Sequence, residues 1–111
     1  MSEIVVVKPT GRLDALTARA LWDELEPLTR QPHARVLADM SDTRYLSSDG
    51  LRVLMRAHRG IQNNHGKMVL CCLSERLGEI IGMAGIDRVL EIQPTFQSAQ
   101  QALERAAQTN S

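Results

Sequence analysis

The sequence VLADMSDTRYLSSDGLRVL, residues 36–54, passes from a short apolar run through polar residues into an amphipathic segment. Residues 36–38 predict a buried strand that ends at Asp39, and residues 41–44 predict a polar loop. Beyond Gly50, apolar residues recur at helical spacing, and Asn-Asn-His-Gly at 63–66 predicts where that helix stops. A strand that leads into a helix in this way is typical of an α/β domain.

The rest of the chain repeats this alternation of strands and helices. Further strands are expected over residues 4–7, 68–73 and 89–92. Because these runs are apolar apart from Glu91, helices should cover both faces of the sheet. We therefore predict one α/β domain over residues 1–111, with a frayed tail at 107–111. Its sheet should be mixed, largely parallel and four- to five-stranded, with about four helices packed on it.

Polar caps mark the starts of the other helices. Asp14 or Thr17 can cap a helix that runs to about residue 28, which Pro27 should loosen or end. Ser74 caps a helix that Gly85 closes, and Thr95 caps the last one.

Composition argues against several classes of function. Thirteen basic residues balance thirteen acidic ones, and only three residues of the 111 are aromatic. A chain without basic excess or stacking platforms is a poor candidate for direct binding of nucleic acid. No apolar run approaches the roughly 20 residues that span a bilayer, and the first residues lack the pattern of a signal peptide. We therefore expect a cytoplasmic protein without membrane insertion.

Reactive residues form no recognisable catalytic or metal motif. Cys71 and Cys72 lie next to each other in a predicted strand, whose alternation should point them to opposite faces as two reduced, buried thiols. Such thiols fit a cytoplasmic location. The three histidines are scattered, and the phosphate-binding and nucleophile-elbow motifs are absent. We expect no cofactor, no metal and no enzymatic activity.

The segment Ser47-Ser48-Asp49-Gly50 stands where the chain enters a helix. Serine and aspartate are preferred there as caps, and aspartate also suits the helix dipole. One cap would suffice, however, and a hydroxyl at a helix start is also a good phosphoacceptor position. Free backbone N–H groups and the positive end of the dipole would accommodate an added phosphate.

Four segments of the chain resemble the STAS domain family, the bacterial anti-sigma-factor antagonists. The longest, residues 45–54, resembles the family's phosphorylation segment, commonly Asp-Ser-Ser/Thr-Gly-Leu or Ser-Ser-Ala-Gly-Leu-Arg. The others are TGRLD at 10–14, VLADMS at 36–41 and AGIDRVL at 84–90. Together they cover nearly the whole chain in order, which implies a STAS-like fold.

The resemblance implies a binding module of a partner-switching pathway. The unphosphorylated antagonist binds an anti-sigma factor, which is also a serine kinase, and relieves its inhibition of a sigma factor or another target. Phosphorylation by this kinase ends the contact, and a metal-dependent serine phosphatase restores it. The family's acceptor lies two residues before the glycine, which here is Ser48, with Ser47 as an alternative.

The partner surface is expected around the loop and first turns of this helix, at Asp42, Ser47, Ser48, Asp49, Gly50, Leu51, Arg52 and Arg56. Arg52, Arg56 and Arg59 share one helix face, which is either a basic stripe for the partner or plain solvated surface. Where many antagonists have a small residue, Asp49 places a fixed negative charge beside the switch.

A second interpretation stays within the same family. The chain could be the STAS subunit of a membrane lipid or anion transporter, bound permanently to its ATPase. In that case the serines would be helix caps only.

Overall fold

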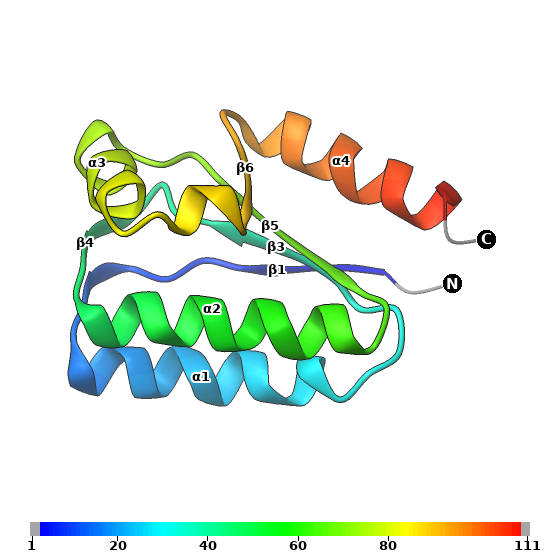
Figure 1. The fold of residues 1–111 in the computed structure, drawn as a ribbon, viewed down its shortest axis with the longest axis horizontal. Helices are drawn as coiled ribbons and strands as arrows, with labels where there is room; N and C mark the ends of the chain where they lie inside the picture. The colour runs from blue at the N-terminus through cyan, green and yellow to red at the C-terminus, as the bar shows by residue number, and fades with distance from the viewer. Residues whose placement is uncertain (1–2, 110–111) are drawn as a thin grey trace.

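The computed structural model describes residues 3–109, which alternate between strands and helices (Figure 1). The strands are β1 (Ile4–Val7), β2 (Gly11–Leu13), β3 (Arg35–Asp39), β4 (Thr43–Leu46), β5 (Lys67–Cys71) and β6 (Glu91–Gln93). The helices are α1 (Ala15–Thr29), α2 (Ser48–Asn63), α3 (Glu75–Met83), the 3₁₀ turn η1 (Ile86–Arg88) and α4 (Phe96–Thr109).

The main sheet has four strands in the order β1-β3-β5-β6. Every pairing in it is parallel, with Val36 of β3 aligned to Val5 on one side and Met68 on the other. This confirms the predicted α/β fold with a largely parallel sheet. The expected mixed character is absent from the described strands, because every strand of the sheet returns through a helical crossover.

Helices lie on both faces of this sheet, as the apolar central strands predicted, although Val5 and Val6 of the edge strand β1 remain 36% and 47% exposed. Helices α1 and α2 lie side by side on one face and α4 lies on the other (Figure 1). Alternate residues of β3 and β5 supply the two cores: Val36, Ala38, Met68 and Leu70 pack with α1 and α2, whereas Leu37, Val69 and Cys71 pack with α4.

Two short strands were not predicted, and one of them, β4, overlaps the expected polar loop at 41–44. Strands β2 and β4 pair in parallel as a separate small sheet. Bonds between segments distant in sequence hold it: the buried Thr43 hydroxyl donates to the Pro9 carbonyl at 2.8 Å, and the Gly11 amide donates to the Asp42 carbonyl at 2.9 Å. Each strand is short and mixes polar residues with one buried leucine, so apolar alternation could not reveal it.

The predicted caps of α1 and α3 are confirmed. Asp14 and Thr17 form one capping box at the start of α1 rather than competing for the role. Pro27 does not end this helix, which continues to Thr29, because it stands in the last turn where few backbone bonds remain to be lost. Ser74 caps α3, and Gly85 adopts φ 74° just beyond it.

The C-terminal elements shift slightly from their expected bounds. The strand predicted over 89–92 is β6 at Glu91–Gln93, because η1 occupies the preceding residues. The Thr95 hydroxyl accepts from the Ser98 amide at 3.0 Å, as a helix cap does. Helix α4 continues to Thr109, into the segment predicted as a tail, and residues 110–111 lie outside the described residues.

Candidate functional site

Ser47 joins β4 to α2 and is the N-cap of that helix. Its hydroxyl accepts from the Gly50 amide at 3.2 Å and donates to the Leu13 carbonyl at 2.6 Å. The Ser47 amide donates to the same carbonyl at 2.9 Å. The half-buried hydroxyl is therefore committed to two bonds that tie α2 to the small sheet.

Ser48 is the first residue of α2 and is exposed. Within residues 3–109, no hydrogen bond engages its hydroxyl. It stands at the positive end of the α2 dipole, where the first backbone N–H groups lack helical partners. The two adjacent serines thus differ sharply: the Ser47 hydroxyl is bonded, and the Ser48 hydroxyl faces solvent.

Gly50 allows the first turn of α2 to lie against β2. A Cβ atom there would be 3.0 Å from Leu13 Cβ and 3.1 Å from the Leu13 carbonyl oxygen. These contacts are tighter than a side chain normally makes. A glycine at this position therefore lets α2 and β2 approach closely. Sequence reasoning placed Gly50 at the site without identifying this reason.

An open groove of about 460 Å³ begins at Ser48 and follows α2. Its lining residues are Ser48, Leu51, Arg52, Met55, Arg56, Arg59 and Ile86. The structure therefore brings four of the predicted partner residues together, along with Arg59. Ile86 comes from η1, far along the chain, and no local pattern pointed to it.

The arginines of the groove differ in their surroundings. The Arg52 guanidinium lies 3.5 Å from Asp49, an exposed pair one turn apart on the helix. The Arg56 guanidinium stacks over the Trp22 ring at 4.2 Å from its centroid. Arg59 is exposed. The groove is thus lined by both basic and apolar side chains, and Arg52 partly offsets the charge of Asp49.

Asp42 lies outside the lining of this groove. It is exposed in the turn between β3 and β4, and its carboxylate is 3.5 Å from the Lys8 ammonium. Such an exposed pair contributes little to stability. The structure therefore places seven of the eight predicted residues in or directly before α2, and Asp42 in a neighbouring turn.

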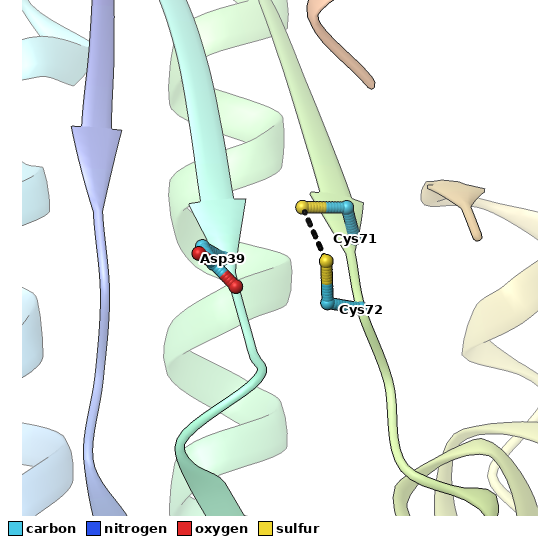
Figure 2. Close-up of side chains that lie close together, drawn as sticks. All are labelled: Asp39, Cys71 and Cys72. Carbon is cyan, nitrogen blue, oxygen red and sulfur yellow. Dashed lines mark hydrogen bonds between the residues drawn. The ribbon is translucent and has the colours of Figure 1, made fainter. Parts of the chain in front are cut away.

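The two cysteines do not point to opposite faces. Strand β5 ends at Cys71, and Cys72 adopts φ 63°, which turns its thiol back to 3.5 Å from the Cys71 sulfur. Figure 2 shows both thiols beside Asp39 at the end of β3. The prediction failed because strand alternation does not extend past the last strand residue.

This cluster is largely buried. Burial raises the pKa of the Cys71 thiol to about 12, assisted by the neighbouring Cys72. Burial alone would also raise the pKa of Asp39, but hydrogen bonds from Ser41 and Cys72 hold it below its usual value. Asp39 is therefore a carboxylate at neutral pH, and Cys71 is a protonated thiol.

Among the described residues, no helix is both long and apolar enough to cross a membrane.

Known proteins share both the sequence pattern and the architecture. The STAS domain family profile matches residues 2–101. An anti-sigma-B factor antagonist of Listeria monocytogenes is 28% identical over 82 residues, covering 74% of this chain and 72% of that protein. An anti-sigma factor antagonist from Mycobacterium paratuberculosis superimposes with a TM-score of 0.79 at 23% identity, covering 91% of this chain and 86% of that one.

The same architecture occurs in transport proteins. The STAS domain of a SulP transporter from Vibrio cholerae superimposes with a TM-score of 0.74 at 13% identity, covering 96% of this chain and 85% of that one. At these identities the solved structures establish the fold alone, whereas the family profile spans most of the sequence. The chain belongs to the STAS domain family.

Proposed function

We propose that this protein is a phospho-switchable antagonist in a partner-switching pathway. Its unphosphorylated form binds an anti-sigma factor that is also a serine kinase, and so relieves inhibition of a sigma factor or another target. Phosphorylation of Ser48 ends the contact, and a metal-dependent serine phosphatase restores it. The observation that carries this proposal is an exposed, unbonded serine hydroxyl at the mouth of a basic and apolar groove.

The choice of Ser48 over Ser47 rests on access. A kinase must bring the γ-phosphate of ATP in line with a free hydroxyl. The Ser47 hydroxyl would have to give up its bonds to Leu13 and Gly50 first. Ser48 requires no such rearrangement, and the start of α2 can accept the added charge.

The groove supplies the chemistry of a protein-binding surface. Leu51, Met55 and Ile86 line it with apolar side chains, and three arginines line it with positive charge. Arginine is enriched at interfaces because it combines a flat, weakly hydrated cation with several donors. A partner with apolar side chains inside an acidic rim would match this surface.

The same proposal assigns no catalysis to this chain. The kinase brings ATP and the catalytic groups, and the chain needs only to present a hydroxyl. The separate phosphatase removes the phosphate. A binding role is supported by relatives that are named as antagonists of anti-sigma factors.

Phosphate mapping tests the acceptor directly. Incubation with the cognate kinase and ATP, followed by peptide mass spectrometry, is expected to place one phosphate on Ser48. Ser48→Ala should abolish the modification. Ser47→Ala should retain it but lower the free energy of unfolding by about 1 to 2 kcal/mol, because the cap and its bond to Leu13 are lost.

The two serine variants serve as controls for each other. If phosphate appears on Ser47, or if Ser48→Ala is still modified to the wild-type extent, the assignment of the acceptor is wrong.

Charge reversal in the groove tests the partner surface. Arg52→Glu is expected to weaken binding of the anti-sigma partner by roughly 10- to 100-fold, since a groove arginine would face an acidic rim. The unfolding temperature should change by no more than about 2 °C, because Arg52 makes only an exposed ion pair. Arg56 is less suitable, since it also stacks on Trp22.

Arg105→Glu is the matched control, with the same charge change on α4, across the sheet (Figure 1). Isothermal titration calorimetry should find it close to wild type. Equal affinities for Arg52→Glu and Arg105→Glu would show that the arginine face does not contact the partner.

A further inference from the structure

Three potential metal ligands meet at the carboxyl edge of the main sheet, outside the groove. Asp39 and Cys71 end neighbouring strands and are aligned partners in the register. Cys72 follows directly. One ligand atom from each residue lies within 4.8 Å of the other two. Figure 2 shows the three side chains at the ends of β3 and β5, with the two sulfur atoms facing each other.

We propose that Asp39, Cys71 and Cys72 bind a thiophilic divalent cation, with zinc as the best match. Two thiolates and one carboxylate form a ligand set that zinc accepts, and the soft sulfur atoms disfavour magnesium and calcium. A fourth position would be left for water. On binding, the two thiols release their protons to solvent as the sulfur–metal bonds form.

The spacing of the ligand atoms fits this geometry. Around a tetrahedral zinc ion with Zn–S bonds near 2.3 Å, ligand atoms lie about 3.3 to 3.8 Å apart. The two sulfur atoms are 3.5 Å apart. The longest separation in the cluster, at most 4.8 Å, requires a shift of about one ångström. Small torsion changes shared among the three side chains can supply this shift.

The backbone supports the same conclusion independently. Cys72 adopts φ 63°, a left-handed conformation that is unfavourable for a residue with a side chain. An extended conformation at this position would send its thiol away from Cys71. Such outliers gather at functional sites, where the surrounding structure holds them in place. Here the outlier is what brings the second sulfur into the cluster.

Access to the cluster is through Cys72. Asp39 and Cys71 are buried, whereas Cys72 is partly exposed. The Ser41 amide donates to one Asp39 oxygen at 3.0 Å, which orients the carboxylate. Such outer contacts fix the direction of a ligand in metal sites. A cation could therefore enter from solvent and meet a carboxylate that is already oriented.

Titration with Co²⁺ and Zn²⁺ tests this proposal on the full chain, kept reduced with a phosphine. Wild type should develop a sulfur-to-cobalt charge-transfer band, which one equivalent of Zn²⁺ removes. At tenfold excess over its Kd, Zn²⁺ should raise the unfolding temperature by about 5 to 10 °C. Cys72→Ser, at the partly exposed position, should lose the band and weaken zinc binding about a hundredfold.

His65→Asn is the matched control. The rings of His33 and His65 stack 5.9 Å apart at the opposite end of α2 and could bind metal by themselves. The variant should retain the sulfur band and the thermal shift. The proposal is overturned if wild type shows no band, if Cys72→Ser binds zinc as tightly as wild type, or if His65→Asn abolishes binding.

Discussion

Replacing Ser48 with aspartate is expected to weaken binding of the anti-sigma partner about a thousandfold while leaving the unfolding temperature nearly unchanged. A like charge at about 4 Å in a partly desolvated interface costs roughly 4 kcal/mol at an effective dielectric constant near 20. Each 1.4 kcal/mol changes affinity about tenfold. A partner surface shaped for the neutral hydroxyl of Ser48 would meet this cost directly.

The groove itself adds a second contribution. Residue 48 precedes Arg52 by one helical turn, and Arg52 already pairs with Asp49 at 3.5 Å. A new negative charge at residue 48 would compete for the same guanidinium. The new charge would draw Arg52 away from the partner, and it would also repel acidic side chains on the partner's rim. Phosphate, with a charge of about −1.5 to −2, should act more strongly than aspartate.

The fold should tolerate the change. Aspartate in the first turn of a helix is favourable by about 0.3 to 1 kcal/mol, because it opposes the positive end of the dipole. The Ser48 side chain is exposed, and within residues 3–109 its hydroxyl makes no hydrogen bond that would be lost. If Ser48→Asp binds the partner weakly but unfolds at the wild-type temperature, the loss of binding comes from the switch and not from unfolding.

Calorimetry with the purified partner and a thermal melt measure both halves of this prediction. Ser48→Ala should bind whether or not ATP is present. Thr95→Asp is the matched control, with the same charge added at the cap of α4 on the other face. Wild-type affinity for Ser48→Asp would exclude the switch and favour a permanently bound STAS subunit.

Apolar patterning predicted the main architecture because burial on both faces leaves a clear signal. The strands around residues 36–38 and 68–71 are apolar throughout, and both are fully covered by helices. The small sheet left no such signal. Its Thr43 is polar, buried and bonded to Pro9, so only the contact between distant segments makes it a strand.

The candidate site could likewise be predicted only in part. The local motif identified Ser48, Leu51 and Arg52, because they follow one another along one helix. Ile86 reaches the groove from η1, and the Trp22 ring from α1 constrains Arg56. These are contacts between elements, which the order of residues alone does not determine. The cysteine cluster was missed because one left-handed residue redirected a side chain.

Gly66 shows a related difference between local pattern and packing. The sequence predicted it only as part of a helix stop after α2. Its backbone needs no left-handed conformation, so flexibility is not the reason for a glycine here. Instead, a Cβ atom would lie 2.4 Å from the Ala34 carbonyl oxygen, 2.8 Å from the Ala34 nitrogen and 2.8 Å from Ile61 Cγ2. Two of these atoms are backbone and cannot rotate away.

Gly66→Ala is therefore expected to be strongly destabilising. The Lys67 amide donates to the Ala34 carbonyl at 2.8 Å, which begins the pairing of β3 with β5. Relieving the clash would push these central strands apart at that bond. We expect the free energy of unfolding to fall by about 3 kcal/mol, and the unfolding temperature by roughly 10 °C.

Urea denaturation and a thermal melt measure this loss, and Gly78→Ala is the matched control. Gly78 is an exposed residue in the middle of α3, and a Cβ atom at this position would have no neighbouring atom within 4 Å. The same substitution there should raise stability by about 0.5 to 1 kcal/mol, because alanine is the better helix former. The opposite signs arise from the close approach of Ala34 and Ile61 to Gly66. A Gly66→Ala protein that unfolds within about 1 kcal/mol of wild type would show that β3 and β5 do not hold Gly66 as tightly as these contacts indicate.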